Sequence, residues 1–162
     1  MYEIERKYLI EYPDTEVLKE KSGGCVFEIT QTYLESTEQC ERRVRKRKSS
    51  DVVEYFYTEK RKITSIKRQE DEKIITESQY IELLKQADTQ KNTLCKTRYC
   101  IGYENKMLEI DVYPFWQDKA IMETELLSEE EKVSFPDFIK VIKEVTDDIE
   151  FKNSSLAKIK MS

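Results

Sequence analysis

The 162-residue sequence contains no histidine, only three glycines and three prolines, and no long apolar run. The absence of histidine excludes imidazole metal sites and every catalytic arrangement built on a histidine base. The scarcity of glycine argues against a glycine-lined nucleotide fold. No apolar segment approaches the roughly 20 residues that span a bilayer. The first seven residues carry two acids and two bases, so we expect neither a membrane anchor nor a signal peptide.

Cysteine is also sparse, and none of the four cysteines belongs to a CxxC pair. Without histidine partners, a zinc site would need all of Cys25, Cys40, Cys95 and Cys100, whose spacing is irregular. Reduced, structural thiols are the default in an intracellular protein. We therefore expect a cytoplasmic location and no zinc.

Charge is abundant: charged residues make up 38% of the chain, as many as the hydrophobic residues. Lys and Arg total 28 and Asp and Glu total 33, which gives a net charge of -5. Ten tyrosines and six phenylalanines argue against disorder. The length fits one domain, which we place over residues 1–162.

Period-two alternation dominates the chain and predicts a mainly β protein of the α+β class. The predicted strands cover residues 2–10, 25–34, 40–48, 53–61, 66–75, 93–103, 106–113 and 119–127. Short connections at 49–51 and 102–105 predict antiparallel hairpins. Helix start signals occur at Asp14, at the Thr76 capping box TESQ and at Ser128, and a last short helix is predicted from Ser154.

The polar faces of these strands carry ionisable residues at i and i+2, as in EIE at 3–5, RVR at 43–45 and ETE at 123–125. Two interpretations compete. In a β-sandwich the charged faces would meet bulk water. In a barrel too wide to be filled by its side chains, they would surround a water-filled tunnel. The apolar residues on the opposite faces, such as Leu108 and Ile110, favour the barrel because they could pack beneath helices.

A charged tunnel restricts what it can contain. Each poorly hydrated ion costs several kcal/mol, against a folding stability of roughly 5–15 kcal/mol. The tunnel must therefore stay wet or be neutralised by a ligand. Carboxylates without histidine or thiol neighbours suit Mg²⁺ or Mn²⁺, and clustered arginine and lysine suit phosphate oxygens. A divalent metal together with a short polyphosphate would match both sets.

The opening EIERK at 3–7 resembles the ExExK signature of the CYTH superfamily, also called triphosphate tunnel metalloenzymes. Further segments similar to the family pattern follow in order over nearly the whole chain: QTYL at 31–34, RVR at 43–45, TEK at 58–60, RQEDE at 68–72, KTR at 96–98, EID at 109–111, ETE at 123–125 and EVTDDIEFKNSSLAK at 144–158. The resemblance implies an eight-stranded antiparallel β-barrel with helices packed outside, in which a divalent metal helps to act on a triphosphate.

The resemblance also implies three sets of site residues, each carried over by motif. The metal ligands, for Mg²⁺ or Mn²⁺, would be Glu3, Glu5, Glu70, Glu72, Asp111, Glu123 and Glu125. The substrate-binding bases would be Lys7, Arg43, Arg45, Lys60, Arg68, Arg98 and, as in some members, Lys158. Catalytic roles would fall to Glu5, Lys96 and Arg98.

Small bacterial inorganic tripolyphosphatases are the members that the chain most resembles, so the leading expectation is hydrolysis of tripolyphosphate to pyrophosphate and phosphate. The alternatives are a thiamine or nucleoside triphosphatase, a class IV-type adenylate cyclase, and a noncatalytic protein that binds polyphosphate or a nucleotide. The absence of histidine disfavours the cyclase, because cyclases of this superfamily usually carry a histidine-containing segment before the ExExK-like strand.

The basic run RRVRKRK at 42–48 could, taken alone, be a nucleic-acid-binding arm. Its alternation and the acidic net charge favour a tunnel strand that continues into a solvated hairpin. We therefore expect a small-molecule triphosphate as partner, with no nucleic acid and no membrane. The sequence leaves the oligomeric state open, a homodimer included.

Overall fold

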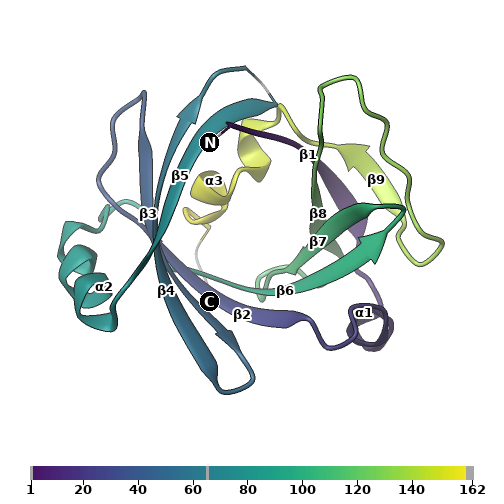
Figure 1. Cartoon of the computed structure of the whole chain (residues 1–162), viewed down its shortest axis with the longest axis horizontal. Helices are drawn as coiled ribbons and strands as arrows, with labels where there is room; N and C mark the ends of the chain where they lie inside the picture. Colours follow the sequence, from purple (N-terminus) through teal and green to yellow (C-terminus); the bar gives the residue numbers. More distant parts are fainter. Residues whose placement is uncertain (1, 65, 160–162) are drawn as a thin grey trace.

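The computed structural model describes residues 2–64 and 66–159, in which nine strands form one antiparallel sheet (Figure 1). The strands are β1 (Tyr2–Glu11), β2 (Val26–Tyr33), β3 (Glu41–Ser49), β4 (Val52–Lys62), β5 (Lys67–Ile75), β6 (Leu94–Tyr103), β7 (Lys106–Val112), β8 (Lys119–Glu125) and β9 (Val141–Glu144). Their order is β5-β4-β3-β2-β6-β7-β8-β1, and the pairing of β1 with β5 closes the ring. The fold is therefore the predicted eight-stranded barrel, with β9 added outside on β1.

All eight predicted strands are present, and their ends lie within two residues of the predicted ends. The two predicted hairpins are also confirmed. Ser50 and Asp51 connect β3 to β4, and Glu104 and Asn105 connect β6 to β7. Glu104 and Asn105 have φ values of 47° and 64°, as the two central residues of a tight hairpin turn require.

Helices are few and short, and their start signals act as predicted at two sites. The Asp14 side chain accepts hydrogen bonds from the first turn of α1 (Thr15–Lys21). The capping box formed by Thr76 and Gln79 begins α2 (Glu77–Leu83), which is followed by the 3-10 turn η1 (Leu84–Gln86). Near the C-terminus, η2 (Ile149–Phe151) precedes α3 (Asn153–Leu156), which overlaps the predicted last helix. None of the helices in residues 2–64 and 66–159 has the length and apolar character needed to cross a bilayer.

The helix predicted from Ser128 is wrong, since this segment forms only a turn. The Glu131 carboxylate accepts a hydrogen bond from the Leu127 amide and pairs with Lys106, so the acidic run is tied to β7. No apolar stripe of helical spacing follows Ser128 that could bury a helix face. The sequence analysis also missed β9, whose four exposed residues are too few to show alternation.

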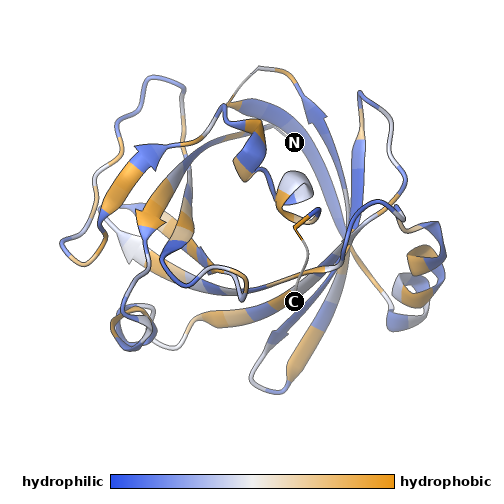
Figure 2. Cartoon of the chain, turned by 180° about the vertical axis from the view of Figure 1, so that it is seen from behind, coloured by the Kyte–Doolittle hydropathy of each residue, from blue (hydrophilic) through white to orange (hydrophobic). Residues whose placement is uncertain are grey.

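The apolar core lies mostly outside the ring of strands. One cluster packs α1, through Leu18, against the outer faces of β1, β6, β7 and β8. A second packs Tyr80 of α2 against the outer face of β3 and β5. Figure 2 shows the resulting alternation of hydrophobic and hydrophilic residues along the strands. A third cluster fills one end of the barrel from inside, where Leu156 and Ala157 at the C-terminal end of the chain meet four strand residues and Tyr113, which follows β7; the strand residues are Leu9, Tyr33, Leu94 and Ile121.

The position of this core generates a stability prediction. Leu108 is fully buried on the outer face of β7, whereas the adjacent Met107 is 53% exposed. We expect Leu108→Ala to lower the free energy of unfolding by about 2–5 kcal/mol because it opens a cavity beneath α1. Met107→Ala, the matched control, should change it by no more than about 0.5 kcal/mol. Urea unfolding measures both values, and equal effects would contradict an external core.

Candidate functional site

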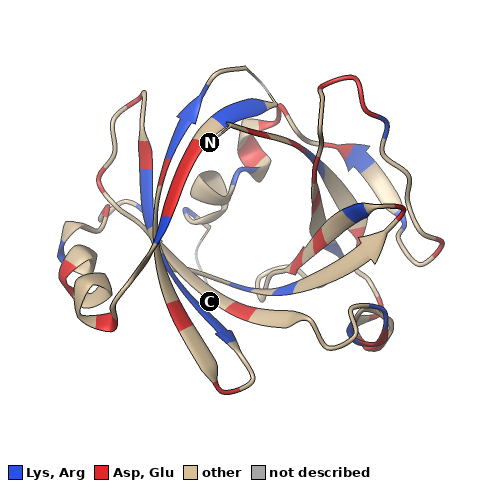
Figure 3. Ribbon diagram, in the orientation of Figure 1, with Lys and Arg blue, Asp and Glu red and all other residues tan. Residues whose placement is uncertain are grey.

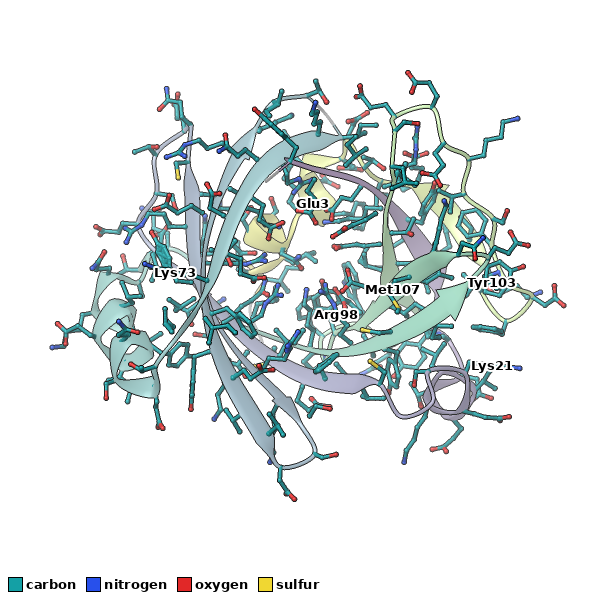
Figure 4. The ribbon with its side chains drawn as sticks, in the orientation of Figure 1. Glu3, Lys21, Lys73, Arg98, Tyr103 and Met107 are labelled. Carbon is teal, nitrogen blue, oxygen red and sulfur yellow. The ribbon has the colours of Figure 1, made fainter. Side chains whose placement is uncertain are left out.

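The inside of the barrel is a charged cavity of about 1290 Å³, whose lining continues over the edge of β5 to α2. Cross-strand partners share a face, so the pairs Glu5–Glu125, Glu109–Glu123 and Lys60–Glu70 all point into this cavity. Charges of both signs occur on strands around the ring (Figure 3). Figure 4 shows Glu3 and Arg98 inside the ring, with Lys21 and Lys73 outside it. The charged faces are therefore internal, and the solvated sandwich is excluded.

An acidic wall occupies β1, β7 and β8. Its members that line the cavity are Glu3, Glu5, Glu109, Glu123 and Glu125. Burial raises the pKa of Glu3 and of Glu5, and their carboxylate neighbours Glu125 and Glu123 add to the rise. One buried oxygen of Glu3, Oε2, has no hydrogen-bond partner in the described part of the chain. The wall therefore carries negative charge that the protein compensates only in part.

A basic wall faces it from β3, β4 and β5. Arg43, Arg45, Lys60 and Arg68 all line the cavity. Arg43 Nη2 lies 3.5 Å and Lys60 Nζ 3.7 Å from Glu70 Oε1, while Arg68 Nη2 lies 3.4 Å from Glu5 Oε1. The buried Nε of Arg43 has no hydrogen-bond partner among the described residues. These ion pairs are long, and they leave nitrogen atoms available to an anion.

Glu70 and Glu72 belong to the basic side of the cavity. Glu70 lies between Arg43 and Lys60, and Glu72 accepts a hydrogen bond of 3.1 Å from Thr58. Both line the cavity, as the sequence predicts, but on a different wall from Glu3 and Glu5. A metal role for these two carboxylates remains a prediction.

Asp111 holds two buried cations of the site by hydrogen bonds. Its two oxygens accept hydrogen bonds from Arg98 at 2.7 and 2.8 Å and from Lys96 at 2.8 Å. Although burial opposes it, the two cations hold the pKa of Asp111 below its usual range. Arg98 also donates to Glu109 and lies 3.8 Å from Glu123. This buried cluster fixes the Arg98 guanidinium at the cavity surface.

Two predicted site residues, Asp111 and Lys96, lie within this buried cluster. Both oxygens of Asp111 accept hydrogen bonds from cations, and its metal-ligand role remains a prediction. Lys96, predicted to be catalytic, has a side chain with no exposed surface, and it lies behind Arg98 rather than on the main cavity wall. Burial, together with the charge of Arg98, lowers the pKa of Lys96 to about 7. In this position Lys96 can support Asp111 and Arg98 but has no exposed surface with which to meet a ligand.

The C-terminal segment supplies a different lysine from the one predicted. Lys158 is exposed and does not line the cavity, whereas Lys152 does. The segment is held where Lys7 Nζ donates to the Phe151 carbonyl at 3.3 Å, and Lys7 also lies 3.4 Å from Glu123. Lys152 immediately precedes α3 and faces the cavity. Lys158 follows the helix and faces away.

Sequence analysis missed two further residues. Arg47 lines the cavity with its guanidinium carbon 4.5 Å from the ring centre of Phe27 and 4.8 Å from that of Phe56. The alternation of RVRKR could have indicated it. Gln31 is completely buried and accepts a hydrogen bond from Arg45. Gln31 belongs to the QTYL segment, but the motif does not show that its partner is Arg45.

The donor set fits a hard divalent cation. Glu3, Glu5, Glu123 and Glu125 supply oxygen ligands only, which Mg²⁺ and Mn²⁺ prefer. The unpartnered Oε2 of Glu3 is a free ligand atom inside the cavity. Within residues 2–64 and 66–159, no three acidic or cysteine side chains already surround one point closely enough to form a finished site.

Comparison with known proteins identifies relatives of the whole chain. The sequence profile described as the CYTH domain matches residues 1–157. The crystal structure of the inorganic triphosphatase NE1496 is 30% identical, with 99% of this chain and 97% of that chain aligned at a TM-score of 0.58. A putative adenylate cyclase from Bacillus halodurans is 20% identical, with coverage of 79% and 82% and a TM-score of 0.53. A putative adenylyl cyclase from Hippeastrum, HpAC1, is 12% identical, with coverage of 77% and 80% and a TM-score of 0.51. A search of curated proteins found no match.

The basic wall generates a pH prediction. Burial, and after it the charge of Arg43, lowers the pKa of Lys60 to about 8 from 10.5. Between these values the unfolded chain binds more protons at this lysine than the folded protein does, so stability rises with pH. We expect the wild type to gain about 1–2 kcal/mol relative to Lys60→Met between pH 7 and pH 9.5. Urea unfolding of both proteins at the two pH values measures this difference. A constant difference would show that Lys60 is not desolvated.

Proposed function

The chain belongs to the CYTH domain family, and from this premise we propose that it is a divalent-metal-dependent hydrolase of a triphosphate. Inorganic tripolyphosphate is the leading substrate, with pyrophosphate and phosphate as products. The proposal rests on one observation: the acidic wall and the basic wall of the cavity each contain a buried polar atom that has no hydrogen-bond partner among the described residues. Glu3 offers a buried oxygen without a donor, and Arg43 offers a buried N–H without an acceptor. A cation and a polyanion bound together would satisfy both.

The basic residues would bind and orient the phosphate chain. Arg43, Arg45 and Lys60 come from neighbouring strands, so they can bind phosphate oxygens from one side. Arg98 approaches from β6 and is held by Asp111, so it requires little reorganisation to meet charge that develops on the transferred phosphoryl group. Such prepositioned donors act strongly because the cavity shields them from bulk water.

Glu3, Glu5, Glu123 and Glu125 would hold the divalent metal. When bound, Mg²⁺ or Mn²⁺ supplies Lewis-acid neutralisation of charge on the phosphate chain. The raised pKa values of Glu3 and Glu5 fit this role, since their carboxylates lack enough positive charge nearby in the protein alone. Ligand binding would relieve repulsion within the acidic wall.

Two further observations support the proposal. The inorganic triphosphatase NE1496 is 30% identical to this chain, and the two align over almost the full length of both chains. The aromatic residues that line the cavity, Tyr2, Tyr33 and Tyr57, each have a lysine or arginine over a ring face, so a nucleotide base that stacked on one of these faces would have to displace a cation. The four cysteines are free, which is consistent with the cytoplasmic location that we propose.

A phosphate-release assay tests the function directly. We expect tripolyphosphate to give a higher kcat/KM than ATP or thiamine triphosphate, and pyrophosphate to react poorly because it is too short to reach both walls. Activity should require Mg²⁺ or Mn²⁺ and disappear with a chelator. Glu5→Gln, which removes charge with little change of shape, should lower kcat/KM by at least about 100-fold while the protein remains folded.

Three outcomes of the assay would contradict the proposal. Equal kcat/KM for ATP and tripolyphosphate would defeat the substrate ranking. Formation of cyclic AMP from ATP would favour the cyclase. Tripolyphosphate binding without any phosphate release would favour a noncatalytic binding protein.

Lys152 and Lys158 provide a matched pair of variants. Lys152→Ala removes a positive charge from the cavity lining, so we expect KM for tripolyphosphate to rise by about three- to tenfold. Lys158→Ala removes the same charge from an exposed position and should leave KM within about twofold. Steady-state kinetics on both variants measures this. The opposite ranking would show that the motif, rather than the observed geometry, identifies the lysine in the site.

A further inference from the structure

Arg45 differs from six other inward-facing bases in what holds it. Lys7, Arg43, Lys60, Arg68, Lys96 and Arg98 each have a carboxylate within ion-pairing distance. No described carboxylate lies that close to Arg45. Its Nε and Nη2 instead donate to the amide oxygen of Gln31, at 3.1 and 2.8 Å.

Gln31 is the cross-strand partner of this arginine, on the same inner face of the barrel. It is completely buried on β2, and it does not line the cavity, whereas Arg45 does. Its amide nitrogen donates to Tyr33 Oη at 3.0 Å, and Tyr33 is itself buried. The three hydrogen bonds of the Gln31 side chain therefore fix both the amide plane and the guanidinium plane. No described residue accepts a hydrogen bond from the remaining nitrogen of Arg45, Nη1.

The chemical identity of the acceptor decides how much charge Arg45 presents. An amide oxygen and a carboxylate oxygen can both accept from the Nε and Nη2 fork. Only the carboxylate would also cancel the positive charge. An amide therefore aligns the guanidinium and leaves its charge available to an anion, whereas Asp111 aligns Arg98 and neutralises it.

We propose that Gln31 is a positioning and affinity-determining residue, which holds Arg45 in the cavity by neutral hydrogen bonds so that its full charge acts on the phosphate chain. This inference rests on the proposed function for the identity of the anion. It predicts opposite effects on stability and on binding when the amide becomes a carboxylate. A purely structural role predicts that both would change together.

The main experiment compares Gln31→Glu with the wild type by calorimetric titration of tripolyphosphate in the presence of a chelator, which separates binding from turnover. We expect Kd to rise at least about tenfold, equivalent to about 1.4 kcal/mol. The melting temperature without ligand should stay unchanged or rise, because the introduced carboxylate would complete an ion pair with Arg45. Gln117→Glu, at an exposed position outside the cavity, is the control for net charge and should keep Kd within about twofold.

A second variant keeps the test valid if Gln31→Glu does not fold. Gln31→Met removes the acceptor without adding charge and should weaken binding less than the glutamate does. In an Arg45→Ala background, Gln31→Met should have no further effect on Kd, because Gln31 acts through Arg45. Equal effects of Gln31→Met in both backgrounds, or a wild-type Kd for Gln31→Glu, would overturn the inference.

Failure of the proposed function is distinguishable from failure of this inference. If the wild type binds tripolyphosphate but does not hydrolyse it, the proposed hydrolase is wrong and the Kd values still judge Gln31. If the wild type hydrolyses tripolyphosphate and Gln31→Glu keeps its Kd and KM, only the inference is wrong. If the wild type neither binds nor hydrolyses tripolyphosphate, both are overturned.

Discussion

Charge compensation inside the barrel is the constraint on which the rest of the structure depends. An isolated ion in a poorly hydrated interior costs several kcal/mol, which is a large share of the stability of a small domain. The protein meets this cost by placing opposite charges on neighbouring strands, so that register determines which ions meet. Lys7 lies beside Glu123 and Lys60 beside Glu70 because their strands pair in that register. If one strand slipped by one residue, its member of such a pair would turn toward the apolar shell.

The same constraint explains where the hydrophobic core lies. A barrel whose interior is charged cannot be stabilised by a central apolar core, so the strands pack outward against α1, α2 and the segment before β9. The exception is the end filled by Leu156 and Ala157, where the inward strand positions change from charged to apolar. The C-terminal segment therefore closes one end of the cavity and delivers Lys152 to its lining. Substrate access is consequently expected from the opposite side, where the lining continues past β5.

Much of this architecture could be predicted from the sequence because period two is a strong signal. The strands, the hairpins and the inward direction of residues such as Arg43 and Glu123 all follow from alternation combined with the family motifs. Features set by three-dimensional partners could not be predicted. The motif around Asp111 shows a carboxylate but not the two cations that occupy it. The sequence likewise shows both Lys152 and Lys158 near the C-terminus, and only the structure determines which of these two faces the cavity.

Arg98 and Arg45 show two ways in which one barrel can hold an inward-facing cation. Arg98 is neutralised by a buried aspartate, so it is held rigidly but has little uncompensated charge to attract a ligand over a distance. Arg45 is held by an amide, so its burial is less well compensated, and the like charges of Arg43 and Arg98 act with desolvation to lower its pKa. Under the proposed function, a polyanion that entered the cavity would relieve this unfavourable electrostatic environment. Stability lost without the ligand would then reappear as binding energy, and the choice of aspartate or glutamine as the partner of each arginine would determine how much.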